Sequence, residues 1–168
     1  MLVKKFVPAY NSFMRLEQKV AQRLIANRKT LAIAESCTGG LVVNRLTNVP
    51  GSSQFLKLGI IAYSNAAKIK LLGVPQTVIR RYGAVSEQTA LAMAKAVQRI
   101  QRTDFGVGIT GIAGPTGATR AKPVGITYIA IHTRLETLCL QYLFKGNRAG
   151  IKSRAATQTL RLLDEFLD

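Results

Sequence analysis

Short apolar runs that alternate with amphipathic segments are the feature that most constrains how this chain folds. Five runs are rich in apolar residues and bounded by turn residues, as strands are: 30–34, 59–64, 104–111, 124–133 and 137–144. Six stretches are predicted to be helices from apolar spacing, caps and glycine or proline stops: 11–28, 41–48, 66–73, 75–82, 87–101 and 147–167. Helices before, between and after five strands predict an α/β fold, a three-layer α/β/α domain with a mixed, mostly parallel sheet.

The domain is expected to cover residues 1–168, with residues 1–10 as an N-terminal extension. The last two predicted strands are joined by only residues 134–136, which is too short for a crossover, so we expect them to be antiparallel. No apolar run approaches the roughly 20 residues that a membrane-spanning helix needs. Because Pro8 interrupts the short apolar stretch near the N-terminus, that stretch is a poor signal peptide, and we expect a cytoplasmic protein that binds no membrane.

The charge balance is strongly basic. Lys and Arg number 24 against 8 Asp and Glu, a formal net charge of +16, and no acidic residue occurs between Glu35 and Glu87. Such a balance favours partners that carry phosphate, although a solvated basic surface is the simpler explanation. Nucleic-acid binding is the less favoured alternative, because aromatic residues do not interleave with the basic ones in a stacking pattern.

Several classes of active site are excluded by composition. The only histidine, His132, lies within a predicted strand, so a histidine-based metal cluster is excluded. The eight carboxylates are scattered, and none form the pair that acid and base catalysis would need. If the protein is an enzyme, the remaining chemistry is metal-free and cofactor-free attack by a serine or threonine that a lysine activates.

Polar loops follow three of the predicted strands: ESCTGG at 35–40, YSNAAK at 63–68 and TGIAGPTGATRAKPVG at 110–125. Ligands bind at the carboxyl ends of strands in α/β sheets, so these loops are expected to converge on one site. A fourth loop, VPGSSQF at 49–55, supplies Ser52 and Ser53.

These motifs, together with LLGV, YGAVSE and KPVG, have the order and spacing of the CinA C-terminal domain family, which the chain resembles from about residue 12 to its end. The family's enzymes are nicotinamide mononucleotide deamidases, also called PncC. The resemblance therefore implies hydrolysis of the carboxamide of nicotinamide mononucleotide to nicotinate mononucleotide and ammonia. It implies no metal or organic cofactor, and we expect a homo-oligomer.

The resemblance assigns the nucleophile to Ser53, the second serine of GSS, and the general base to Lys68, the lysine that closes YSNAAK. A neutral amine can take the proton of a serine hydroxyl, and both burial and neighbouring cations lower the pKa of a lysine. The alternative for Lys68 is an ordinary solvated lysine on a helix.

Three further residues match functional positions of the family. Tyr63 is expected to orient Lys68 or to face the pyridine ring, and Thr110 to hydrogen-bond the reacting amide or the lysine. Arg148 is expected to hold a phosphate through its bidentate guanidinium. Their ordinary alternatives are a sheet-end aromatic, a strand-end turn and a surface charge.

The ESCTGG loop is interpreted as a binding loop. Glu35, Ser36 and Thr38 are expected to line the site, with Ser36 hydrogen-bonding the nucleophile or the substrate. Gly39 is also assigned to substrate binding, because glycines let backbone N–H groups at a helix start face an anion. Gly111, in the third loop, is assigned to substrate binding as well. Cys37 is not expected to be the nucleophile, because the chain offers it no credible histidine partner.

Two alternatives remain open. The first is a basic module without enzymatic activity that binds DNA or a recombination protein, and it predicts DNA binding that falls steeply with salt. The second is an amidohydrolase for another pyridine or pyrimidine nucleotide.

Overall fold

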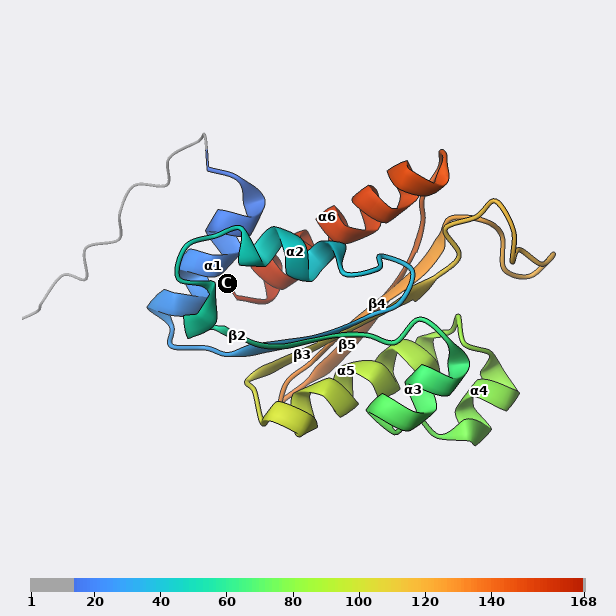
Figure 1. The fold of residues 1–168 in the computed structure, drawn as a ribbon, viewed down its shortest axis with the longest axis horizontal. Helices are drawn as coiled ribbons and strands as arrows, with labels where there is room; N and C mark the ends of the chain where they lie inside the picture. The colour runs from blue at the N-terminus through green and yellow to red at the C-terminus, as the bar shows by residue number, and fades with distance from the viewer. Residues whose placement is uncertain (1–13, 168) are drawn as a thin grey trace, which may run out of the picture.

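The computed structural model describes residues 14–167 and contains the three predicted layers (Figure 1). The expected extension at residues 1–10 lies outside the described residues. The five strands have the order β2-β1-β3-β4-β5, with bounds β1 Leu31–Glu35, β2 Leu56–Ile61, β3 Phe105–Gly111, β4 Ile126–His132 and β5 Thr137–Leu143. β1 pairs in parallel with β2 and β3, and β4 is antiparallel to both β3 and β5. The predicted mixed sheet, parallel at its centre, is therefore confirmed.

All six predicted helices are present: α1 Leu16–Ala26, α2 Leu41–Thr47, α3 Asn65–Leu72, α4 Gln76–Tyr82, α5 Glu87–Gln101 and α6 Arg148–Phe166. A short 3₁₀ turn, η1, covers Ser52–Gln54. Helices α1, α2 and α6 cover one face of the sheet, and α3, α4 and α5 cover the other (Figure 1). Within residues 14–167, no helix is long and apolar enough to cross a membrane.

The central strand β1 supplies a core on each face of the sheet. All five of its residues are buried, as expected for a strand that helices cover on both sides. Leu31 and Ile33 belong to the core beneath α1, α2 and α6, whereas Ala32 and Ala34 pack with Met93 of α5 on the opposite face. Successive side chains of a strand point to opposite faces, so one apolar run builds both cores.

Two glycines of β3 allow α5 to pack directly on the sheet. A Cβ atom at Gly108 would collide with the carbonyl oxygen of Ala90 and lie 2.6 Å from the backbone nitrogen of Ala94. A Cβ atom at Gly106 would collide with the carbonyl oxygen of Ala94. Because the obstructing atoms are backbone, they cannot turn aside as a side chain does, and this close packing requires glycine.

Strand β2 begins and ends three residues before its predicted bounds of 59–64. Its register pairs Leu56 with Leu31 and Ile61 with Glu35. Tyr63 and Ser64 therefore lie beyond the strand, and Ser64 caps α3 by accepting a hydrogen bond from the Ala67 N–H at 3.0 Å. The earlier end of β2 leaves Tyr63 in the loop at the carboxyl edge of the sheet.

Candidate active site

A buried lysine lies at the carboxyl edge of the sheet. Lys68 is only 2% exposed although it lies in a short helix, so it is not the solvated surface lysine that was its alternative. Its Nζ lies 2.9 Å from Ser36 Oγ, and it donates hydrogen bonds to the carbonyl oxygens of Ala62 at 2.9 Å and Tyr63 at 3.3 Å. Two of the predicted loops, ESCTGG and YSNAAK, therefore meet at this amine.

The surroundings of Lys68 favour its neutral form. Burial lowers the pKa of its amine, since desolvation penalises the charged state. Among residues 14–167, no carboxylate forms an ion pair with Lys68. In a neutral amine, the two N–H groups can bind the carbonyls of Ala62 and Tyr63, which leaves the lone pair for the Ser36 hydroxyl. At this distance a neutral Lys68 can accept a hydrogen bond from the Ser36 hydroxyl.

Glu35 holds the loop that carries Ser36. Its side chain is fully buried, and its carboxylate accepts hydrogen bonds from the N–H groups of Gly40 at 2.9 Å, Val42 at 3.3 Å and Val43 at 2.9 Å. These are the N–H groups at the start of α2, where a helix favours negative charge. The anion at this helix start is therefore a side chain of the protein, and Glu35 positions the loop.

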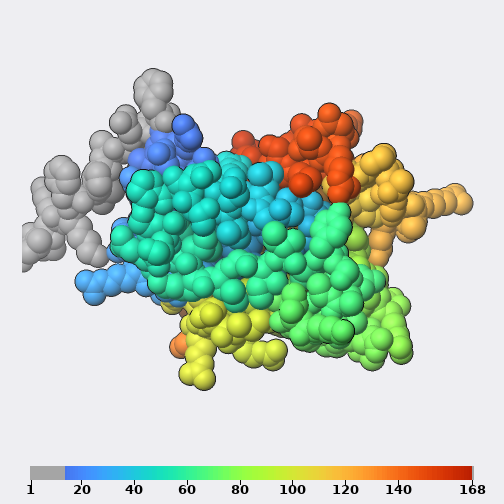
Figure 2. Space-filling view, in the orientation of Figure 1, coloured from blue at the N-terminus to red at the C-terminus, as the bar shows by residue number. Residues whose placement is uncertain are grey.

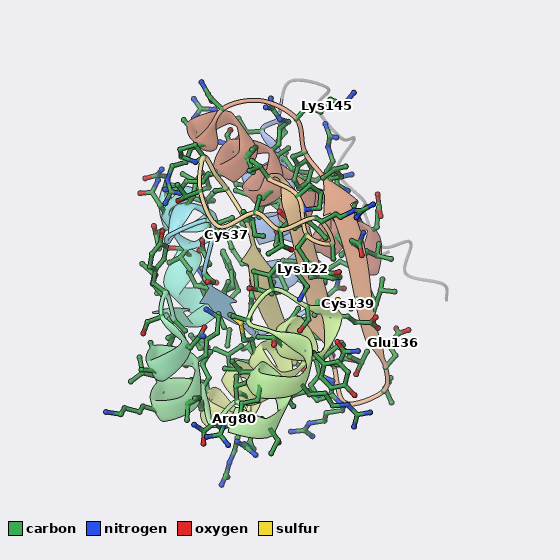
Figure 3. All side chains as sticks on the ribbon, turned by 90° about the vertical axis from the view of Figure 1, so that its right-hand side faces the viewer. Cys37, Arg80, Lys122, Glu136, Cys139 and Lys145 are labelled. Atoms are coloured by element: carbon green, nitrogen blue, oxygen red, sulfur yellow. The ribbon has the colours of Figure 1, made fainter. Side chains whose placement is uncertain are left out.

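Cys37 is buried behind the same loop. It is 7% exposed, and desolvation raises the pKa of its thiol to about 12, so it is neutral and a poor nucleophile at neutral pH. A Cβ atom at Gly111 would lie 3.0 Å from Cys37 Sγ, so Gly111 allows β3 to pack against the loop. The other cysteine, Cys139, lies elsewhere in the molecule, and both are free thiols (Figure 3).

Ser53, the expected nucleophile, is not brought to Lys68 within one chain. It lies in η1, is exposed, and precedes β2, whereas Lys68 follows the end of that strand. Six strand residues at about 3.3 Å each separate the two ends by roughly 20 Å. Strand direction therefore places Ser53 at the amino edge of the sheet, and the serine that meets Lys68 is Ser36.

Tyr63 and Arg148 do converge on the site. The Arg148 guanidinium donates to the Tyr63 hydroxyl at 2.7 Å and to the carbonyl oxygen of Gly114 at 2.6 Å. These bonds join the start of α6 to the loop after β2 and to the loop after β3. On the surface, the loops near residues 40 and 63 meet α6 on one face of the molecule (Figure 2). The Tyr63 side chain is 60% exposed and so is accessible to a ligand.

Thr110, expected to hydrogen-bond the reacting amide or the lysine, is buried at the end of β3. It is 1% exposed, and its hydroxyl donates to the carbonyl oxygen of Ala84 at 2.7 Å. Thr110 therefore anchors the connection between α4 and α5 to the end of β3. Thr38 is fully buried, and its Oγ1 has no hydrogen-bond partner among the described residues.

One residue at this edge was missed by sequence reasoning. Lys152 approaches the ESCTGG loop so closely that a Cβ atom at Gly39 would lie 3.3 Å from its Nζ. The spacing could have indicated it, because Lys152 follows Arg148 by four residues on a helix and therefore shares its face. No group of three metal-binding side chains is found among residues 14–167.

Replacing Glu35 tests whether its carboxylate holds the loop. Glu35→Gln removes the negative charge but keeps the shape, and it leaves at least one backbone N–H with a weaker acceptor. We expect a loss of about 1.5–3 kcal/mol in the free energy of unfolding, which is typical of hydrogen bonds to a charged group. Urea denaturation measures it, with Glu136→Gln in the exposed β4–β5 turn as the control. Equal stability of the two variants would contradict this role.

Comparison with known proteins agrees with the motifs and the fold. The CinA C-terminal domain matches residues 14–167. A CinA-like protein of Syntrophus aciditrophicus (strain SB) is 49% identical over 153 residues, which cover 90% of this chain and 36% of that protein. The chain thus spans little more than a third of the length of the curated relatives it matches.

Two solved structures extend the likeness to three dimensions. A competence or damage-inducible protein from Enterobacter asburiae has a TM-score of 0.88 at 33% identity, over 91% of this chain and 96% of that one. The competence/damage inducible protein CihA from Agrobacterium tumefaciens has a TM-score of 0.86 at 34% identity, over 94% of this chain and 99% of that one. On the sequence match and the shared fold, this chain belongs to the CinA C-terminal domain family.

Proposed function

We propose that this chain hydrolyses the carboxamide of nicotinamide mononucleotide to nicotinate mononucleotide and ammonia. The observation that carries the proposal is the buried Lys68 amine 2.9 Å from Ser36 Oγ, which forms no ion pair with a carboxylate in the part of the chain that the structure describes. A serine beside a neutral lysine is a recognised arrangement for acyl transfer. The choice of substrate rests on the resemblance to the deamidases of the family.

In this proposal the nucleophile is Ser36 and not Ser53, because Ser36 is the hydroxyl that Lys68 contacts. Neutral Lys68 takes the Ser36 proton as Oγ attacks the carboxamide carbon. The protonated amine then gives that proton to the leaving nitrogen, ammonia departs, and an acyl ester of Ser36 remains. Water, deprotonated by Lys68, hydrolyses the ester to the carboxylate and restores the serine.

Two neighbouring side chains have roles in binding. The exposed Tyr63 ring is available to pack on the pyridine, and its hydroxyl is held by Arg148. The Arg148 guanidinium has five N–H donors, of which the Tyr63 hydroxyl and the Gly114 carbonyl take two. The remaining donors can bind the phosphate of the nucleotide.

Matched serine variants test the proposal. We expect Ser36→Ala and Lys68→Met to lower ammonia release from nicotinamide mononucleotide by at least about a thousandfold, because each removes one half of the reacting pair. Ser53→Ala should retain activity near that of the wild type, since the chain places it at the other edge of the sheet. Ammonia is followed in EDTA, and circular dichroism checks that each variant is folded.

The opposite pattern of activity in the two serine variants would contradict the assignment of Ser36 as the nucleophile. If Ser53→Ala is inactive and Ser36→Ala is active, the nucleophile is Ser53, and it must reach Lys68 from a second copy of the chain. Mixing inactive Ser53→Ala with inactive Lys68→Met protein would then restore activity in a homo-oligomer. Absence of ammonia release from the folded wild-type protein would contradict the deamidase function itself.

The lowered pKa of Lys68 predicts how activity depends on pH. Only the neutral amine can accept the Ser36 proton, so kcat/KM should rise with pH and level off, with a midpoint below 10.5, the ordinary lysine value. Cys37 opposes this shift when its thiol is ionised, but with a pKa of about 12 the thiol stays neutral over this range. A flat profile from pH 6 to 10 would contradict a lysine base.

The free energy of unfolding should also depend on the protonation of the Lys68 amine. The folded pKa of Lys68 is lowered, so between that pKa and 10.5 the unfolded chain binds the extra proton, and the free energy of unfolding rises with pH. Lys68→Met removes this rise. Urea denaturation across the range should therefore give curves for the two proteins that converge as the pH approaches 10.5.

A second function is favoured by the distribution of charge. Helices α3, α4 and α5 carry five exposed cations, Lys70, Arg80, Arg81, Lys95 and Arg99, against one carboxylate, Glu87. The ion pairs of the described residues lie elsewhere, on α1, α2, α6 and the amino edge of the sheet. Figure 3 shows Arg80 projecting from this face. Such a surface suits the phosphate backbone of DNA.

Salt dependence tests this second function. If the basic face binds DNA, Ser36→Ala protein should bind a short duplex with an affinity that falls steeply as salt rises, and Arg80→Ala with Arg81→Ala should reduce the slope of that dependence by about two. The control is Lys145→Ala with Arg161→Ala, which removes two exposed cations from the other side of the sheet. DNA binding by the basic face would be contradicted if the protein does not bind the duplex at low salt. It would also be contradicted if the two pairs of substitutions weaken binding equally.

A further inference from the structure

The start of α6 carries positive charge where a helix ordinarily carries negative charge. Its first turn contains no acidic residue and begins with Arg148, and Lys152 follows one turn later. The N-terminus of a helix already has a partial positive charge, so cations there are unfavourable unless an anion joins them. We propose that Lys152 binds the phosphate of the substrate together with Arg148, and so makes the site prefer phosphorylated nucleotides to nucleosides. This inference rests on the proposed deamidase function.

The position of Lys152 is the first argument. Its Nζ lies so close to Gly39 that a Cβ atom there would be 3.3 Å away, so its amine reaches the backbone of the ESCTGG loop. The side chain is half-buried, and it makes no hydrogen bond or ion pair with residues 14–167. An anionic ligand beside Gly39 would give this ammonium a charged partner.

The second argument is the hydroxyl of Thr38. Thr38 precedes Gly39 in the same loop, is fully buried, and has an Oγ1 without a hydrogen-bond partner in the described part of the chain. Buried polar atoms are nearly always paired in folded proteins, and the exceptions call for an explanation. The unpaired hydroxyl lies in the same loop that the Lys152 amine approaches.

The third argument is the uncompensated charge of Arg148. Both of its hydrogen bonds go to neutral oxygens, those of Tyr63 and Gly114. A guanidinium and an ammonium on successive turns of one helix face make a site for a compact dianion, such as a phosphomonoester, which carries nearly two negative charges at neutral pH.

The loop links this anion site to the reacting pair. The Gly39 N–H donates to the carbonyl oxygen of Ser36 at 3.1 Å, which closes a tight turn between them. Lys68 lies at the Ser36 end of this turn and Lys152 at the Gly39 end. In a mononucleotide the amide and the phosphate likewise lie apart, on different sides of the ribose. The amide would bind at the Lys68 end of the turn and the phosphate at the Lys152 end.

Ribose 5-phosphate is the probe that tests the subsite apart from the chemistry, because it carries the phosphate but no carboxamide. Calorimetry should give binding to the wild-type protein, at least about tenfold weaker binding to Lys152→Ala, and recovery in Lys152→Arg, which keeps the charge. Arg161→Ala is the control, since Arg161 is an exposed cation farther along α6. If wild-type protein does not bind the probe, or Lys152→Ala binds it equally well, the inference is wrong.

Kinetics separate this inference from the deamidase proposal. Lys152→Ala should raise KM for nicotinamide mononucleotide by about tenfold with little change in kcat, and leave turnover of nicotinamide riboside, which lacks phosphate, unchanged. An equal loss on both substrates would overturn the phosphate role while leaving the deamidase function in place. Failure of the deamidase function is reported separately, by the absence of ammonia from the wild-type protein, and does not affect the ribose 5-phosphate result.

Discussion

The hydrogen bonds between the Glu35 carboxylate and the start of α2 are the interaction on which the rest of the site depends. They bind the chain at the point where β1 ends, because three N–H groups of the helix converge on one buried carboxylate. The residues between, from Ser36 to Gly39, are thereby held as a short loop at the carboxyl edge of the sheet. One end of this loop contacts Lys68, and the Lys152 amine approaches the other. Glu35 thus fixes the segment that lies between these two lysines.

Basic side chains outnumber carboxylates at this edge, where Lys68, Arg148 and Lys152 lie near the carboxylate of Glu35. Among the residues that the structure describes, Lys68 forms no ion pair, Arg148 donates to neutral oxygens, and Glu35 accepts hydrogen bonds from the helix it caps. Burial lowers the pKa of Lys68, and Cys37, when ionised, acts in the opposite direction. In the proposed function, Arg148 and Lys152 bind an anionic substrate beside this amine. A lysine base and a phosphate site are compatible at one edge of the sheet, because burial lowers the pKa of Lys68 while Arg148 and Lys152 bind the phosphate.

Much of the fold followed from local patterns. The apolar run of β1 and the spacing, caps and stops of the six helices are recognisable in the sequence, and the structure contains these elements. The bounds of β2 were not predicted correctly. Its residues are only partly buried, so the local sequence does not mark where the strand begins and ends. Pairing with β1 selects the register from Leu56 to Ile61. The polar loops were expected to converge on one site, and Tyr63 and Arg148 lie within hydrogen-bond distance of each other there. The resemblance assigns the nucleophile to Ser53, whereas the hydroxyl that lies beside Lys68 is that of Ser36.

The sequence alone determined the class of fold, the family and the set of polar loops, because strand and helix periods, caps and motif spacings are properties of neighbouring residues. Tertiary structure decided which serine meets the lysine. Ser53 is 15 residues from Lys68 and Ser36 is 32 residues away, yet β2 carries Ser53 to the far edge of the sheet and its parallel pairing with β1 brings Ser36 to the near one. Strand direction and register act across the sheet, so no local pattern in the sequence reports them.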